Sequence, residues 1–189
     1  SGNASFSGTN LWNSGDIYVT GTLEVTSNFQ LPANSRLIVL AGGAVRVSGQ
    51  MEVLGGSTFY NGASTTVGGT LKITNERGVI INDQTIKAAN IEVTNNNSSL
   101  VNNAVVEVSG NILVTNQGLL KNESSVKAAS LTFNNGLMDN YGTTTISGET
   151  NATNSTVKLS NYGAFTTNTL SMQGGAKVYN YCHMTIVDN

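Results

Sequence analysis

Side chains able to do chemistry are few in this chain and do not form a recognisable set. The sequence has one histidine, His183, and one cysteine, Cys182. A catalytic triad, a multi-histidine metal site, a disulfide and a cysteine-based zinc site each need more of these residues. Cys182 and His183 are adjacent in the sequence, which is not a spacing typical of a nucleophile and its base. We therefore expect both residues to lie at a corner of the fold.

The carboxylates are equally scattered. The four aspartates, Asp16, Asp83, Asp139 and Asp188, lie far apart in the sequence, and the calcium-binding nonapeptide pattern GGxGxDxUx is absent. Acid–base chemistry on sugars needs two carboxyl groups held at a defined separation. The sequence thus predicts no catalytic residues, no metal site and no cofactor.

Composition narrows the class of protein further. Among the 189 residues the formal net charge is −2 and only 11% are charged, against about 25% in an ordinary domain. This gives no electrostatic footprint for nucleic acid, and no apolar run is long enough to enter a membrane. Val, Leu and Ile alternate with Asn, Thr, Ser and Gly, and no long stretch has a helical period. The elements that position the side chains must therefore be strands.

An apolar-x-Asn motif repeats along the chain. After Asn61 the asparagines follow at intervals of 21, 20, 20, 18, 21 and 19 residues. Val39-x-Ala41 fills one vacant slot, and an inserted loop at 27–36 explains the long gap before it. The matches are Leu11-x-Asn13, Phe59-x-Asn61, Ile80-x-Asn82, Leu100-x-Asn102, Leu120-x-Asn122, Met138-x-Asn140, Leu159-x-Asn161 and Val178-x-Asn180.

Each repeat contains three short strands with period-2 alternation, separated by Gly, Asn and Ser corners. A unit of about 20 residues cannot bury its apolar side alone, so successive units must stack. The sequence predicts an all-β, single-stranded parallel β-helix of about nine coils, right-handed as parallel connections usually are. Residues 11–189 form this solenoid, and residues 1–10 are a cap or tail. We also expect the natural chain to continue past Asn189, or two ends to meet in an oligomer.

The repeated asparagines are expected to be structural. Asparagine tolerates the left-handed conformation at a corner, and its amide can bond to local backbone. Stacked at the spacing of the coils, the amides would form an asparagine ladder. Its rungs are Asn61, Asn82, Asn102, Asn122, Asn140, Asn161 and Asn180.

Charged residues test the proposed stacking. Lys87, Glu107 and Lys127 fall in one column on successive coils, and Glu52, Lys72 and Glu92 fall in another, with alternating signs in both. Opposite charges on stacked neighbours stabilise a sheet. Glu24 above Glu52 would be an unfavourable pair, unless the 27–36 insertion separates them.

Two surface features are candidate binding sites. The outward residue of the repeated motif gives an apolar stripe over the first five coils. This stripe is either covered by the first ten residues or the 27–36 loop, or it binds a partner. A second set follows the corner asparagines and is either a stack that protects a corner or a sugar-binding edge. The stripe is Trp12, Leu40, Tyr60, Ile81 and Val101, and the stack is Tyr141, Tyr162 and Tyr181.

The recurring segments GTLEVTSN (21–28), GTLKITN (69–75) and GNILVTN (110–116) resemble repeats of bacterial extracellular proteins. Adhesins and autotransporter passengers are similar, and more so the Asn/Gly-rich β-helical regions of Bacteroidota surface proteins, including some with an LruC-type domain. The resemblance implies an extracellular or cell-surface module without enzymatic activity, a stalk or adhesin segment. Its expected partners are other domains of the same longer chain, a glycan or a surface protein.

Two other functions remain open. Polysaccharide lyases and hydrolases share the β-helical scaffold, so a carbohydrate-active or glycan-binding protein is the alternative. Ice binding would need Thr-x-Thr columns over many coils, and only Thr143-x-Thr145 fits, so it ranks last.

Overall fold

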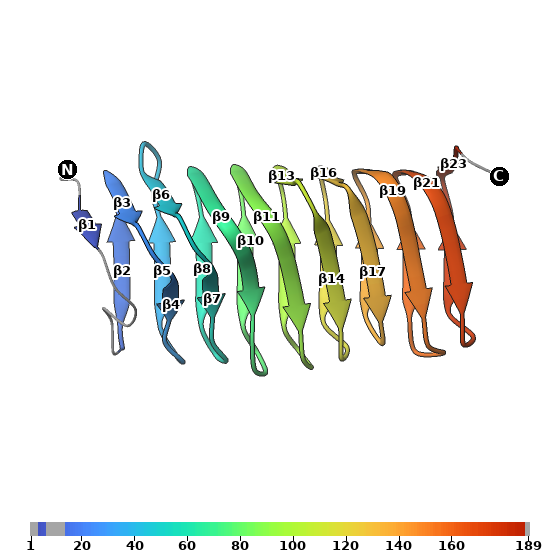
Figure 1. Ribbon diagram of the computed structural model, residues 1–189, viewed down its shortest axis with the longest axis horizontal. Helices are drawn as coiled ribbons and strands as arrows, with labels where there is room; N and C mark the ends of the chain where they lie inside the picture. Colours follow the sequence, from blue (N-terminus) through green and yellow to red (C-terminus); the bar gives the residue numbers. More distant parts are fainter. Residues whose placement is uncertain (1–3, 7–13, 188–189) are drawn as a thin grey trace.

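The computed structural model describes residues 4–6 and 14–187, which form strands, turns and bends. Successive coils stack along one long axis, with the two ends of the chain at opposite ends of the rod (Figure 1). All strand pairings are parallel, as expected for a β-solenoid. Among the described residues there is no helix that is long and apolar enough to cross a membrane.

One side of the rod, face 1, is a nine-stranded parallel sheet with one strand from each coil. The predicted parallel β-helix of about nine coils is therefore confirmed. The strands are β2 (Asp16–Val19), β5 (Arg36–Val39), β8 (Thr58–Asn61), β10 (Val79–Asn82), β12 (Ser99–Asn102), β15 (Leu119–Asn122), β18 (Leu137–Asn140), β20 (Lys158–Asn161) and β22 (Lys177–Asn180).

Two further sides complete each coil. Four long strands bend from face 2 into face 3, namely β9 (Ser64–Ile73), β11 (Thr85–Thr94), β19 (Thr143–Thr153) and β21 (Ala164–Gln173). The other strands of face 2 are β1 (Ala4–Phe6), β3 (Thr22–Val25), β6 (Ala44–Val47), β13 (Val105–Val108), β16 (Ser125–Ala128) and β23 (His183–Ile186). Those of face 3 are β4 (Phe29–Leu31), β7 (Met51–Val53), β14 (Asn111–Thr115) and β17 (Ser130–Asn134).

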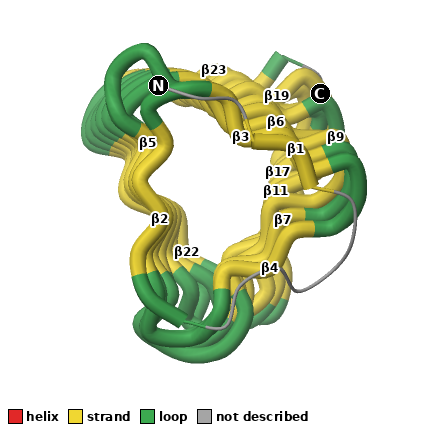
Figure 2. Tube along the Cα trace, turned by 90° about the vertical axis from the view of Figure 1, so that its left-hand side faces the viewer, coloured by secondary structure: helices red, strands yellow, loops and turns green. Residues whose placement is uncertain are grey.

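The coils wind in the predicted right-handed sense. Figure 2 looks along the axis from the N-terminal end, and the chain passes clockwise from β2 through β3 to β4 as it recedes. Inward side chains from the three faces meet in one continuous apolar core. Phe59, Phe133 and Phe165, one from each face, are fully buried there.

The prediction of an inserted loop at 27–36 is wrong. Phe29–Leu31 is strand β4 of face 3, paired with Met51–Val53, so the second coil starts at Arg36 and no insertion is needed. Glu24 consequently lies beside Arg46, and Gln30 is the neighbour of Glu52. The unfavourable stacking of Glu24 on Glu52 does not occur. Residues 4–6 pair with β3, and the remainder of 1–13 lies outside the described residues.

Candidate interaction surfaces

The asparagine ladder is confirmed as a continuous column at the ends of the face 1 strands. Each side-chain Nδ2 donates to the Oδ1 of the asparagine one coil later, over 2.7–2.8 Å. The first six rungs are fully buried. The rungs are the predicted ones: Asn61, Asn82, Asn102, Asn122, Asn140, Asn161 and Asn180.

Each ladder amide also bonds the backbone that turns from face 1 to face 2. The Nδ2 of Asn102, for example, lies 3.1 Å from the Ala104 carbonyl oxygen and 2.9 Å from that of Ser125, one coil on. One side chain thus ties its own corner and the next corner together. Because both the donor and the acceptor of each buried amide are used, the desolvation of these polar groups is compensated.

The conformational part of the ladder prediction is wrong. The rungs are the last residues of extended strands, and none of them has a positive φ. The left-handed asparagines lie instead at the corner between face 3 and face 1. They are Asn34, Asn75, Asn95, Asn97, Asn116, Asn135 and Asn154.

The ladder begins at the third coil. Val39 stacks on Asn61, and Val19 stacks on Val39, so valine fills the slot in the first two coils. The alignment through Val39-x-Ala41 is therefore two residues out of register, and Leu11-x-Asn13 lies outside the described residues. The free acceptor of the first rung is satisfied by Thr65, whose hydroxyl donates to Asn61 Oδ1 over 2.8 Å.

Three tyrosines that directly follow ladder asparagines form a stack. The ring centroids of Tyr141 and Tyr162, and of Tyr162 and Tyr181, are 4.8 Å apart, and the ring planes differ by 7° and 5°. The Lys121 Nζ lies 5.6 Å from the Tyr141 centroid. Both faces of Tyr162 are therefore covered by neighbouring rings. A sugar can reach that ring only along its edge, whereas sugar stacking requires an open face.

The outward column on face 1 is apolar in its first five coils, but Leu40 is not a member of it. Tyr18 and Ile38 stack with Tyr60 in this column. Leu40 lies just past the end of β5, and Trp12 lies outside the described residues. Ile81 and Val101 continue the column as predicted, and Lys121 follows them.

A second outward column on face 1 adds three apolar side chains that the sequence reasoning missed. Val79, Leu119 and Leu137 are each half-buried and project from the strand positions that precede the inward residue. The sequence contains the evidence for them, because VIIN, LLKN and LMDN have apolar residues at both outward and inward positions. The apolar face, as we call it, consists of Tyr18, Ile38, Tyr60, Val79, Ile81, Val101, Leu119 and Leu137.

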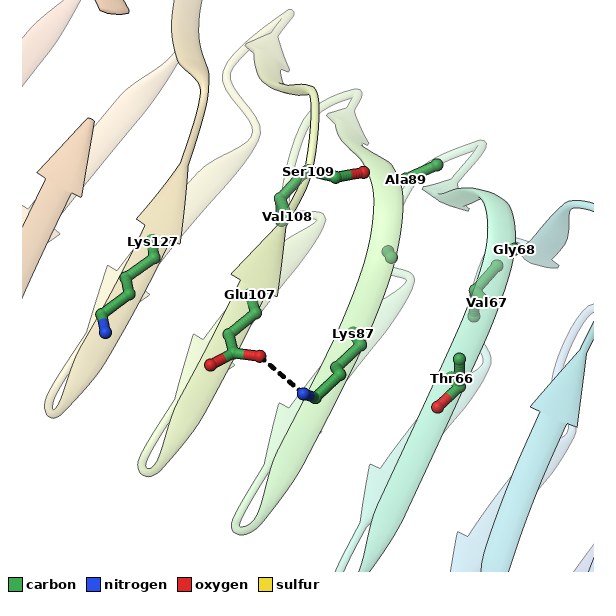
Figure 3. Close-up of a pocket in the computed structure, with 10 residues that line it drawn as sticks. Thr66, Val67, Gly68, Lys87, Ala89, Glu107, Val108, Ser109 and Lys127 are labelled. Carbon is green, nitrogen blue, oxygen red and sulfur yellow. Dashed lines mark ion pairs between the residues drawn. The ribbon is translucent and has the colours of Figure 1, made fainter. Parts of the chain in front are cut away.

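A shallow groove of about 500 Å³ lies at the corner where face 2 bends into face 3 (Figure 3). Three small residues at the bend, Gly68, Ala89 and Ser109, line it. Glycine is required at position 68, because a Cβ there would lie 2.3 Å from the Ser48 carbonyl oxygen. The bend thus leaves a depression along the axis.

Three charged side chains line one wall of the groove. The Nζ of Lys87 lies 2.8 Å from a carboxylate oxygen of Glu107, and Figure 3 shows both side chains on the same side as Lys127. The hydrogen bond and the charge of Lys87, with a smaller contribution from Lys127, hold the pKa of Glu107 below its usual value. Lys127 forms no ion pair with any described residue. The groove therefore offers a free ammonium beside a charged pair.

Other carboxylates form separate ion pairs or hydrogen bonds and do not cluster with one another. Asp16 forms a two-pronged ion pair with Arg36, whose hydrogen bond lowers the pKa of that carboxyl. Asp83 accepts from the Tyr60 hydroxyl, which raises the pKa of the phenol. Lys121 forms an ion pair with Glu123. No group of three potential metal ligands occurs in the described ranges 4–6 and 14–187.

The last two chemical candidates remain isolated. Cys182 is exposed, and His183 lies 2.9 Å from the Thr185 hydroxyl.

The Thr143-x-Thr145 pair, the one match to an ice-binding column, is flanked by Ser125-x-Lys127 and Ala164-x-Thr166 on the adjacent coils. The threonine pair is thus not repeated on either neighbouring coil.

Comparison of the chain with models of protein families, with curated proteins and with solved structures gave no match.

Proposed function

We propose that this chain is a non-enzymatic structural and adhesive module, a stiff stalk of a bacterial cell-surface or secreted protein. The observation that supports this proposal is the unbroken ladder from Asn61 to Asn180. Each of these coils is bonded to the next through its strands and through a buried side-chain amide. Such a rod can hold a distal domain of a longer chain, or one of its own faces, at a fixed distance from a surface.

The sequence resemblance supports the location. The Asn/Gly-rich coils resemble those of adhesins and of Bacteroidota surface proteins, including the LruC-type group. On this proposal the partners are other domains of the same protein, and a glycan or surface protein bound along the rod. No cofactor is required for either role.

Single-molecule force spectroscopy tests the mechanical role. Tyr18→Cys and Tyr179→Cys provide handles at the two ends of face 1, in a Cys182→Ser background. We expect a distinct rupture peak, and a lower rupture force when Asn102→Val interrupts the ladder. Asn103→Ala is the control, because its exposed amide bonds only the Asp83 carboxylate in the described structure. Gradual extension of the unmodified chain without a rupture peak would contradict a stalk.

An assay for polysaccharide cleavage tests the other half of the proposal. Cleavage of any polysaccharide by the purified chain would contradict a non-enzymatic role.

Glycan binding in the groove is the second candidate function. The observation that favours it is the combination of a depression of about 500 Å³ with charged groups along its wall. The Lys127 ammonium can donate to a carboxylate or a hydroxyl, and the Lys87–Glu107 pair offers both a donor and an acceptor. The small residues that line the groove, Gly68, Ala89 and Ser109, would let a sugar chain approach the backbone closely.

A glycan array with the purified chain tests this role. Lys87→Ala and Lys127→Ala together are expected to abolish any binding that occurs in the groove. Lys72→Ala is the matched control, because Lys72 pairs with Glu92 on face 3 and lies outside the groove. Equal binding by the double variant and the control would exclude the groove as the site.

A further inference from the structure

The apolar face differs from the other two sides of the rod. On the outward strand positions of faces 2 and 3, the described large apolar residues are the isolated Val105 and Leu113. Face 1 instead carries eight neighbouring apolar or aromatic side chains over seven successive coils. A contiguous apolar patch of this kind usually marks an interface.

We propose that face 1 binds face 1 of a second copy of this chain, with the two rods antiparallel. The two-fold axis passes through β12, the fifth of the nine strands of this sheet. Val101 then faces Val101 of the second copy, and Leu119 faces Val79 of the second copy. This inference is independent of the mechanical and glycan-binding proposals.

Matching periodicity argues for a second copy as the occupant. The side chains of face 1 repeat at the strand spacing of about 4.8 Å, and another face 1 is a flat surface with the same repeat. A hollow of about 400 Å³ beside Leu119 and Leu137 gives room for an inserted side chain, which the antiparallel arrangement supplies as Val79. Rows of side chains can therefore meet in register along the length of the face.

The size of face 1 predicts a weak but specific dimer. Nine strands of about four residues give a surface of roughly 40 by 13 Å, or about 500 Å² per copy. The pair would bury about 1,000 Å², the lower limit for a specific interface. We therefore expect dissociation in the micromolar range, on the order of 1–100 µM.

Charges at the two rims select the antiparallel arrangement. One rim carries Lys158 and Lys177, and the other carries Arg36 paired with Asp16. Parallel rods would gather the Lys158 and Lys177 side chains of both copies at one end of the interface. Antiparallel rods divide the lysines between the two ends, with Lys177 opposite Asp16 and Lys158 opposite Arg36, whose charge is already paired with Asp16. Like-charge contacts across an interface are costly, so the antiparallel pair is favoured.

The charged side chain nearest the centre does not obstruct the contact. The Nζ of Lys121 lies 2.7 Å from a carboxylate oxygen of Glu123 and over the ring of Tyr141. The ammonium group therefore lies toward the corner between face 1 and face 2. Only the aliphatic part of Lys121 remains over the face, where it can pack against Ile81 of the second copy. The interface thus has an apolar centre and charged rims.

Sedimentation equilibrium over a wide concentration range tests the dimer. The chain is expected to shift from monomer to dimer, and Leu119→Lys is expected to remain monomeric. Leu113→Lys makes the same substitution at a half-buried outward leucine of face 3 and should dimerise like the unmodified chain. Circular dichroism should show that both variants keep the β fold. A monomer at about 1 mM, or equal effects of the two substitutions, would overturn the proposal and leave the face to a different protein.

Cross-linking tests the arrangement. In a Cys182→Ser background, Val101→Cys with a short bis-maleimide should give a covalent dimer, because the two residues meet on the axis. Ile38→Cys should not, because the antiparallel pair separates its two copies by about six coils, or roughly 29 Å. Efficient cross-linking at Ile38 would exclude the antiparallel arrangement, whatever the result at Val101.

Discussion

The ladder asparagines show how one side-chain type can serve every coil. A carboxamide donates and accepts at once, so an identical residue above and below satisfies both functions in a buried column. Serine is too short to span two coils, and valine can fill the volume but cannot bond. Val19 and Val39 show that valine fits the slot where no rung precedes it.

Replacing a central rung should cost more than replacing the first one. Asn102→Val removes the bonds to Asn82 and Asn122 and also the bonds from the Asn102 amide to the Ala104 and Ser125 carbonyl oxygens. We expect a loss on the order of 3 kcal/mol in the free energy of unfolding. Asn61→Val breaks one rung bond, beside Val39, and the hydrogen bond from the Thr65 hydroxyl, so a smaller loss is expected. Denaturant titration measures both, and equal losses would show that the rungs do not act on both neighbours.

A phenol on the apolar face should report its hydrogen bond to a carboxylate. Asp83 raises the pKa of Tyr60 by accepting a hydrogen bond from its hydroxyl and by its negative charge. This contribution to stability is therefore present below the ordinary tyrosine pKa of about 10 and is lost as the pH rises through the raised value. Asp83→Asn should lower the pKa of Tyr60, measured by NMR of labelled tyrosine rings. An unchanged titration would show that the two groups do not interact in solution.

At the scale of the element, the corners from face 3 to face 1 depend on left-handed residues. Most of these are asparagines, which tolerate the conformation, but Arg77 and Gln117 also have φ of 66° and 65°. A side chain other than Asn or Gly is disfavoured there, because its Cβ approaches the following carbonyl. These two corners are accordingly the least well adapted ones.

Arg77→Gly should therefore stabilise the protein. Relief of the left-handed strain exceeds the entropy that glycine loses on folding, for a gain of about 0.5–1 kcal/mol. Arg46→Gly is the contrasting variant, because Arg46 lies in strand β6 with ordinary extended backbone and should lose stability. Thermal unfolding monitored by circular dichroism measures both changes. A destabilised Arg77→Gly variant would mean that the arginine side chain makes a contribution of its own.

The strands could be predicted from the sequence wherever the asparagine repeat marks the register. From Phe59 onward, the alternation of apolar residues gives the correct columns, including Lys87–Glu107–Lys127. The first two coils were misaligned because valine replaces asparagine at positions 19 and 39. With no asparagine to mark that register, the sequence pattern predicts a loop where the strand Phe29–Leu31 forms.

The surfaces were harder to predict than the core. The sequence pattern predicts the outward position next to the asparagine. It does not predict Val79, Leu119 and Leu137 as surface residues, because an apolar residue beside a core position resembles another core residue. The groove could not be foreseen at all. It depends on where the strands bend between Ala88 and Asn90. Small residues such as Ala89 do not indicate a groove until the position of that bend is known.

At the scale of the whole molecule, the two candidate surfaces lie on different sides of the rod. The apolar face is face 1, and the groove runs where face 2 meets face 3 (Figure 2). A dimer formed through face 1 would therefore leave both grooves open to solvent. Pairing would also double the cross-section of the rod, which stiffens it, so the proposed interface and the proposed stalk role are compatible.

The central claim is that residues about twenty apart lie over one another in a single rigid rod. Double electron–electron resonance between spin labels at Tyr18→Cys and Tyr179→Cys, in a Cys182→Ser background diluted with unlabelled protein, measures this directly. The labelled strands β2 and β22 are the first and last of nine on face 1, so we predict a narrow distribution near 38 Å, eight steps of about 4.8 Å. A much shorter distance, as in two sheets packed face to face, or a broad distribution would contradict the rod.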